Sequence, residues 1–238
     1  MRFDVVTLFP EIFEGFASTS FVARAIGGGK LTLRFRSPRD FGLGKHRSVD
    51  DTPYGGGSGM VMRVDVLVAT MESLDADAPS GSRAHRVLLT PQGRVLGQKR
   101  VEELAARAAV MLICGRYEGF DERVREYVDE EISLGDFVMT GGEVAAMAIV
   151  EACARLLPGV LGNEASLMEE SHSPQAGGLL EYPQYTRPVE FRGARVPEVL
   201  QGGHHFEIAK WRRERAIERT QQKRPDLWER FRRGKGET

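Results

Sequence analysis

The 238-residue sequence is poor in the features that mark secreted, membrane-spanning and disulfide-stabilised proteins. Its two cysteines, Cys114 and Cys153, are far apart and form no C-x-x-C pair, so neither a disulfide framework nor a zinc site is indicated. We expect both to be buried as small apolar groups. The longest apolar stretch, 144–157, is interrupted by Glu151 and Arg155 and is too short to span a bilayer. The first residues lack a cationic segment followed by an apolar one, so we expect a soluble, cytoplasmic protein with no membrane partner.

The sequence also lacks the common nucleotide-binding motifs. It contains neither the glycine-lysine-serine/threonine ending of a Walker loop nor a Gly-x-Gly-x-x-Gly fingerprint, which disfavours a nucleotide-dependent phosphoryl-transfer enzyme. The segment Asp50–Met60 is rich in glycine, and taken alone it is as readily a flexible turn as an anion-binding loop. The five histidines suggest no metal site, because the adjacent His204 and His205 would point in different directions on a helix.

Charge is balanced overall, with a net value of −1, but it is uneven along the chain. Residues 118–151 contain ten acidic residues against two basic ones, whereas residues 206–235 contain eleven lysines and arginines against five acidic residues. Trp211, Trp228 and Phe231 lie among these basic residues. Such aromatics commonly form a small core, whose outer face here would present cations to phosphate groups. The acidic middle and the basic tail therefore suggest separate roles.

Segments with strand and helix patterns alternate along the first two thirds of the chain. Strands are expected at 3–9, 31–35, 86–89 and in the apolar run before Gly115, and helices after Pro10 and at 65–74, 97–108 and 142–157. This alternation predicts an α/β fold with a mainly parallel sheet and helices on both faces. The 142–157 helix is apolar on almost every face, so it is either deeply buried or packed on a partner subunit. Residues 37–60 have no regular period and are expected to form a long, functional loop.

Composition divides the chain into three parts. Residues 1–158 are expected to form the α/β domain. Residues 159–186 contain glycine, serine, proline and acidic residues without a period, and we interpret them as an interdomain linker. Residues 187–238 contain two charged segments, 204–222 and 225–233, that predict a small α-helical domain at the C-terminal end.

Three glycine-containing loops follow strand-like segments or lead into the apolar helix. They occupy Val87–Gly93, Ile113–Gly119 and Ser133–Glu143. In open α/β sheets ligands bind beyond the carboxyl ends of the strands, so these loops predict one shared pocket. Arg116 and Glu118 lie on the second loop, where they are either site residues or a structural salt bridge.

Nine short motifs follow one another along nearly the whole chain. They are Leu8–Glu11, Ser37–Phe41, Val49–Met60, Pro91–Arg94, Gly115–Arg123, Gly135–Asp136, Gly141–Glu143, Pro158–Gly162 and Tyr185–Pro188. Each motif is weak alone, but together and in register they resemble the bacterial tRNA (guanine-N(1)-)-methyltransferase family. That family methylates the guanine immediately 3′ of the anticodon.

The resemblance implies a SPOUT-class domain with a deep trefoil knot and a homodimer whose active sites lie at the subunit interface. It also implies S-adenosylmethionine as the methyl donor and magnesium as a further cofactor. By similarity the donor contacts Leu89, Pro91, Gln92, Gly115, Tyr117, Glu118, Ser133, Leu134, Gly135, Gly141 and Gly142.

The reaction needs a base near N-1 of guanine, which carries a proton, and a cation or donor near O-6, where negative charge develops. In the family an arginine at the end of the α/β-domain helix serves O-6, and this position corresponds to Arg155. The family base is an aspartate in the linker, within Glu-Ala-Ser-x-x-x-Asp-Ser. This chain has Glu170 at that position, so the resemblance implies that Glu170 is the general base, with Glu169 as a lesser candidate.

The same resemblance implies tRNA as the substrate, gripped by the loop 39–60 and by the basic C-terminal helices, with the linker closing over the target base. A non-catalytic RNA-binding module, using the α/β domain only to dimerise, would also explain the basic tail. It would leave the three pocket loops unexplained.

Overall fold

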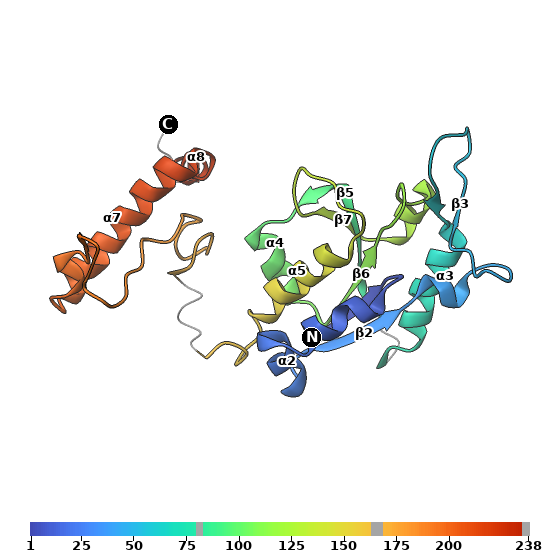
Figure 1. Cartoon of the computed structure of the whole chain (residues 1–238), viewed down its shortest axis with the longest axis horizontal. Coiled ribbons are helices and arrows are strands. Elements are labelled where there is room, and N and C mark those ends of the chain that lie inside the picture. The colour runs from blue at the N-terminus through green and yellow to red at the C-terminus, as the bar shows by residue number, and fades with distance from the viewer. Residues whose placement is uncertain (80–82, 163–168, 235–238) are drawn as a thin grey trace. The chain divides into compact units, whose positions relative to one another are not determined.

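The structure is a computed structural model, and it describes residues 1–79, 83–162 and 169–234 (Figure 1). The chain divides into two compact units, Met1–Gly162 (unit 1) and Asn163–Thr238 (unit 2). In the described ranges, no helix combines the length and the apolar character needed to cross a bilayer.

Unit 1 is built on a five-stranded sheet in which all paired strands are parallel. The strands are β1 (Arg2–Val6), β2 (Thr32–Arg36), β5 (His85–Val95), β6 (Ala109–Cys114) and β7 (Glu130–Ser133), in the order β2-β1-β6-β5-β7. The helices are α1 (Glu14–Ala17), α2 (Ser20–Gly27), α3 (Val64–Ala76), α4 (Gln98–Ala105) and α5 (Glu143–Ala154). Short 3₁₀ helices occupy Pro10–Phe13, Pro38–Phe41 and Glu122–Tyr127.

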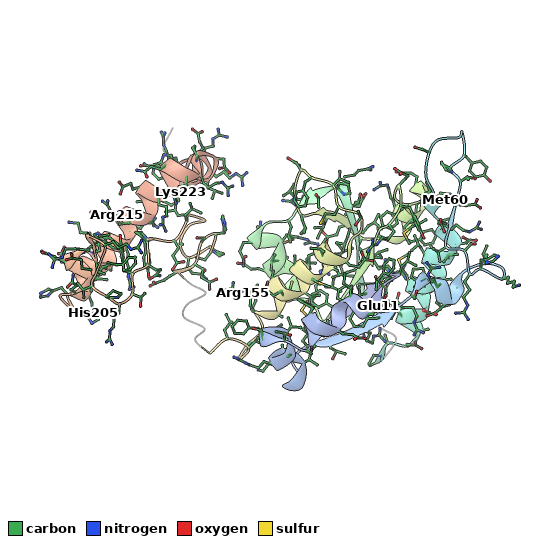
Figure 2. All side chains as sticks on the ribbon, in the orientation of Figure 1. Glu11, Met60, Arg155, His205, Arg215 and Lys223 are labelled. Atoms are coloured by element: carbon green, nitrogen blue, oxygen red, sulfur yellow. The ribbon has the colours of Figure 1, made fainter. Side chains whose placement is uncertain are left out.

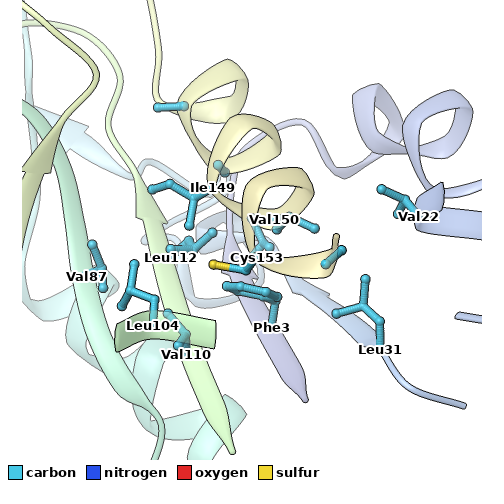
Figure 3. Close-up of a cluster of buried hydrophobic side chains, with 14 of the residues drawn as sticks. Phe3, Val22, Leu31, Val87, Leu104, Val110, Leu112, Ile149, Val150 and Cys153 are labelled. Atoms are coloured by element: carbon cyan, nitrogen blue, oxygen red, sulfur yellow. The ribbon is translucent and has the colours of Figure 1, made fainter. Parts of the chain in front are cut away.

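Helices cover both faces of the sheet. Successive side chains of a strand point to opposite faces, so the apolar strands present apolar side chains on both. On one face Phe3 and Leu112 pack with Ile149 and other residues of α2, α4 and α5 (Figure 3). On the other face Met111 packs against Leu67 and its neighbours on α3. The predicted mainly parallel α/β architecture is therefore confirmed.

Both cysteines are buried, as predicted. Cys114 ends β6 and Cys153 lies on the inner side of α5 (Figure 3). Desolvation by burial raises the pKa of the Cys114 thiol well above its ordinary value and raises that of Cys153 to about 12. Both thiols are therefore neutral and unreactive packing groups.

The first strand is shorter than the predicted range 3–9. It ends at Val6, because the Thr7 hydroxyl accepts a hydrogen bond of 3.0 Å from the backbone N–H of Phe9 and so turns the chain. The helix expected after Pro10 begins there as a 3₁₀ turn.

Strand β5 carries an irregularity where the cavity described below forms. Leu89 and Arg94 both pair with Ile132 of β7, so the four residues between them leave the sheet. Gly93 closes this bulge, since a Cβ atom there would lie 2.5 Å from the backbone nitrogen of Ile132. The close approach of the two backbones therefore requires glycine at this position.

The long loop predicted at 37–60 contains one small sheet of its own. Strands β3 (Asp50–Asp51) and β4 (Val61–Met62) pair antiparallel around the glycine-rich turn. Four residues of this turn, Gly55, Gly56, Gly57 and Gly59, have positive φ. Glycine is the residue that reaches this region without a steric penalty.

Unit 2 contains α7 (His205–Lys223), α8 (Pro225–Gly234), a 3₁₀ helix at Glu198–Leu200 and a hairpin of β8 (Glu190–Phe191) and β9 (Ala194–Arg195). Both C-terminal helices were predicted, whereas the hairpin was not. Its strands are only two residues long, too short for an alternating pattern to be visible. Residues 169–182, within the range interpreted as a linker, contact α7.

The bulge on β5 generates a prediction about stability. Gly93→Ala should lower the free energy of unfolding of unit 1 by about 2 kcal/mol, because the added methyl group forces two strand backbones apart. Gly97→Ala is the matched control, since its Cβ would meet nothing within 4 Å, and it should change stability by less than about 0.5 kcal/mol. Urea unfolding followed by circular dichroism measures both. Tryptophan fluorescence reports unit 2, which holds Trp211 and Trp228, and should not shift. Equal stability of the two variants would contradict this prediction.

Candidate ligand-binding site

A cavity of about 270 Å³ opens at the carboxyl ends of β5, β6 and β7. Because the three strands are parallel, their carboxyl ends meet at one edge of the sheet. All eleven residues predicted to contact a ligand line this cavity: Leu89, Pro91, Gln92, Gly115, Tyr117, Glu118, Ser133, Leu134, Gly135, Gly141 and Gly142. The structure therefore brings together in one place the three loops that the sequence suggested.

The loop after β6 has a constrained backbone. Tyr117 has φ +59°, in the left-handed region that side chains other than glycine rarely adopt. The glycine-rich loop holds this conformation, because the N–H of Glu118 donates to the carbonyl of Met60 at 3.0 Å and the N–H of Met62 donates to the carbonyl of Gly119 at 2.9 Å. The segment that was ambiguous in the sequence is thus part of the cavity's support (Figure 2 labels Met60).

Three glycines leave room that any side chain would fill. A Cβ atom at Gly142 would lie 2.8 Å from the Cα of Cys114, and one at Gly115 would lie 2.7 Å from the ring of Phe120. A Cβ atom at Gly141 would lie 2.3 Å from the Arg116 guanidinium. At Gly142 the nearest atoms are backbone atoms of β6, so the third loop can lie directly against the end of this strand only with glycine at position 142. At Gly115 and Gly141 the neighbours are the side chains of Phe120 and Arg116, which would have to move.

Arg116 pairs with Glu143, not with Glu118. Its Nη2 lies 2.9 Å from Oε2 of Glu143 and its Nε donates to Oε1 at 3.3 Å. Oε2 has no hydrogen bond of good geometry, so the closer contact is an ion pair. Arg116 therefore does form a structural salt bridge, but its partner is Glu143 and not Glu118. Glu143 begins α5, 27 residues further along the chain.

The carboxylate of Glu143 is almost completely buried, with 2% of its side chain exposed. The hydroxyl of Thr7 donates to its Oε1 at 2.8 Å. The Arg116 guanidinium also lies over the ring of Phe9, 4.5 Å from its centroid. Glu143 occupies the first turn of α5, where the helix dipole favours a negative charge. This cluster fixes the start of α5 and the loop after β6 to each other.

Two residues that the sequence did not single out also shape the cavity. Arg125 lies on its wall, and its Nη2 donates to the side-chain oxygen of Gln92 at 2.7 Å. Phe120 closes the side next to Gly115. Arg125 belongs to a 3₁₀ helix with a highly charged sequence, which is typical of a solvent-exposed surface. No local pattern therefore indicated that Arg125 lines the cavity.

The two predicted catalytic residues lie in different units. Arg155 caps the C-terminal end of α5 in unit 1 (Figure 2). Glu170 lies in unit 2, where its carbonyl accepts a hydrogen bond of 3.1 Å from the N–H of Ser173. The preceding part of the linker motif, 164–168, falls outside the described residues. Among the described residues, no three histidine, cysteine or acidic side chains gather as a metal site would require, so the structure assigns no magnesium site.

Comparisons with known proteins place this architecture in a well-populated group. The family model described as "tRNA (Guanine-1)-methyltransferase TrmD" matches residues 1–230. A tRNA (guanine-N(1)-)-methyltransferase of Sorangium cellulosum is 66% identical, over 98% of this chain and 96% of that protein. One of Gloeobacter violaceus is 54% identical, over 95% and 98% respectively. The crystal structure of the tRNA (m1G37) methyltransferase from Aquifex aeolicus aligns with a TM-score of 0.76 and 40% identity, covering 95% of this chain and 94% of that one.

The buried carboxylate at the start of α5 generates a second prediction. Glu143→Gln should destabilise unit 1 by about 3 kcal/mol, because it leaves the half-buried Arg116 guanidinium without its counter-charge. Thr7→Val should cost about 1 kcal/mol alone and less in the Glu143→Gln background, since its hydroxyl donates to that carboxylate. Glu72→Gln is the matched control, on an exposed position of α3 in the same unit. Urea unfolding gives the four values, and strict additivity of the two changes would refute the coupling.

Proposed function

This chain belongs to the tRNA (guanine-N(1)-)-methyltransferase family, and from that premise we propose that it transfers a methyl group from S-adenosylmethionine to N-1 of the guanine immediately 3′ of the anticodon in tRNA. The activity for which its relatives are named supports the reaction and the substrate. The observation that carries the proposal is the convergence of the eleven predicted contact residues on one cavity at the strand ends.

The residues of the cavity fit S-adenosylmethionine. Glycines at 115, 141 and 142 let backbone groups approach a ligand closely, and Leu89 and Leu134 offer apolar contact. The Glu118 carboxylate and the exposed Tyr117 ring add polar and aromatic surface. When bound there, S-adenosylmethionine supplies an electrophilic methyl group on a sulfonium. The SPOUT-class trefoil knot belongs to this proposal, as the family feature that would hold the three loops together.

Two side chains are proposed to act on the guanine. Glu170 removes the proton from N-1, so that the nitrogen lone pair can form the new bond to carbon as the carbon–sulfur bond breaks. Arg155 stabilises the negative charge that develops on O-6. Glutamate in place of the family's aspartate keeps the carboxylate but extends it by one methylene group. A displacement of about 1 Å can cost on the order of 100-fold in rate, so the backbone around Glu170 must compensate.

A homodimer is part of the proposal. Val144 on α5 is 55% exposed and lines a shallow apolar cavity of about 560 Å³ together with Phe16, Phe21 and Met147. Val138, on the rim of the site cavity, is 84% exposed. Exposed apolar surface of this kind marks an interaction site. A second copy of the chain would cover it and complete each active site at the subunit interface.

The tRNA is proposed to contact both units. Lysines and arginines of α7 and α8 would supply phosphate affinity that falls with salt, and the loop 39–60 would approach the anticodon region. The target base must be splayed into the site and recognised by its edge. A dependence on magnesium stays a prediction from the resemblance.

Methylation of a defined RNA tests the proposal directly. With labelled S-adenosylmethionine, a tRNA transcript carrying guanine immediately 3′ of the anticodon should be labelled, and mass spectrometry should identify the product as 1-methylguanosine. A transcript with adenine at that position is the control and should remain unlabelled. Tight binding of both transcripts without methyl transfer would instead favour the non-catalytic RNA-binding module.

The identity of the base generates a separate prediction. Glu170→Gln should lower the single-turnover rate of methyl transfer by at least about 100-fold, because general-base catalysis contributes that much or more. Glu169→Gln, one residue away, should lose less than about tenfold. Dissociation constants for tRNA and S-adenosylmethionine, measured in parallel, separate chemistry from binding. A near-normal rate for Glu170→Gln would remove this residue from the mechanism.

A further inference from the structure

Residues 170–181 form a loop closed by its own hydrogen bonds. The N–H of His172 donates to the carbonyl of Leu179 at 2.9 Å, and the N–H of Glu181 donates to Oγ of Ser171, also at 2.9 Å. The Leu179 side chain is completely buried. Glu170 is therefore the first residue of a compact loop whose two ends are hydrogen-bonded to each other.

This loop is attached to α7 at a buried point. The N–H of Leu180 donates to the hydroxyl of Thr220 at 2.9 Å, and that hydroxyl in turn donates to the carbonyl of Ala216 at 2.7 Å. Thr220 is fully buried. The Thr220 hydroxyl thus uses both its donor and its acceptor capacity, and it ties the loop to one position along the helix.

A second attachment lies at Glu169, directly before Glu170. The hydroxyl of Tyr182 donates to Oε2 of Glu169 at 2.5 Å, and Nη1 of Arg212 lies 3.4 Å from the same oxygen. The Arg212 guanidinium also lies over the Tyr182 ring, 4.7 Å from its centroid. Burial and the hydrogen bond to Glu169 raise the pKa of Tyr182, so its hydroxyl keeps the proton that it donates.

These contacts engage the carboxylate of Glu169. The ion pair is exposed and adds little stability by itself, but the charge-assisted hydrogen bond from Tyr182 is short and directional. It fixes the side chain of Glu169 against Tyr182. A carboxylate engaged in this way is suited to holding the chain from which the next residue, Glu170, extends.

We propose that Glu169, Tyr182 and Arg212 form an anchor that positions Glu170 for removal of the N-1 proton. Glu169 is then a positioning residue that acts through its neighbour, and helix α7 carries the base and the phosphate-binding cations together. This inference rests on the proposed role of Glu170 as the base. It also explains how a longer glutamate can replace aspartate, because the anchor fixes the backbone from which that side chain extends.

The test is the single-turnover rate of methyl transfer at saturating tRNA and S-adenosylmethionine. Tyr182→Phe removes one hydroxyl and should lower this rate by roughly tenfold, while both dissociation constants change by less than about twofold. Glu169→Ala should lose about as much. Glu169→Gln should recover most of the rate, since its amide oxygen still accepts from Tyr182.

Matched controls distinguish the effect of losing the anchor from the effect of merely removing a positive charge or a hydroxyl. Arg195→Gln removes the same charge from unit 2 but at a residue of β9 that pairs with Glu190, and Tyr185→Phe removes a hydroxyl three residues from Tyr182; both should keep the saturated rate. Arg212→Gln should lower it. Circular dichroism and tryptophan fluorescence check that each variant is folded.

The decisive comparison uses the Glu170→Gln background. If the anchor acts through Glu170, Tyr182→Phe should cause no further loss there. Two results would overturn the anchor and leave the proposed base in place. One is a full tenfold loss from Tyr182→Phe in the Glu170→Gln background. The other is a normal rate for both Tyr182→Phe and Glu169→Ala while Glu170→Gln is slow. A Glu170→Gln enzyme as fast as wild type would overturn the base itself.

Discussion

The parallel pairing of β5, β6 and β7 is the constraint on which the rest of unit 1 depends. It brings the ends of three strands to one edge of the sheet, so loops that are far apart in the chain line one cavity. Strand pairing alone would leave these loops free to separate. The ion pair between Arg116 and the buried Glu143 joins the second loop to the helix that follows the third. Gly142 allows the backbone of the third loop to approach the end of β6.

Local sequence patterns predicted most of the fold and the three loops that line the cavity. Apolar runs such as the one ending at Cys114 identified the strands, and the eleven contact residues implied by the family resemblance line one cavity. Long-range pairing was harder to predict. Arg116 has Glu118 two residues away but pairs with Glu143, a contact that depends on the tertiary approach of the loop after β6 to the start of α5. Arg125 was missed for the same reason, since its role depends on Gln92 from another loop.

Unit 2 shows a different limit of sequence patterns. Residues 169–182 have no helical or strand period, which suggested a linker, yet they form a closed loop on α7. The stabilising groups are single hydroxyls, at Ser171, Tyr182 and Thr220, and their partners are backbone groups or one carboxylate. A periodic sequence pattern cannot predict such contacts, because each one forms only when two segments distant in the sequence come together in the fold. The acidic segment 118–151 lies in unit 1, and the basic segment 206–235 lies in unit 2.

The central claim is that the cavity at the strand ends holds the methyl donor. A crystal structure of the protein with S-adenosylhomocysteine, the product left after transfer, tests this most directly. The account predicts electron density for the whole ligand between the loops at Leu89–Gln92, Gly115–Glu118 and Ser133–Gly142. Density at another place in the molecule, with these three loops empty and binding confirmed by calorimetry, would contradict it.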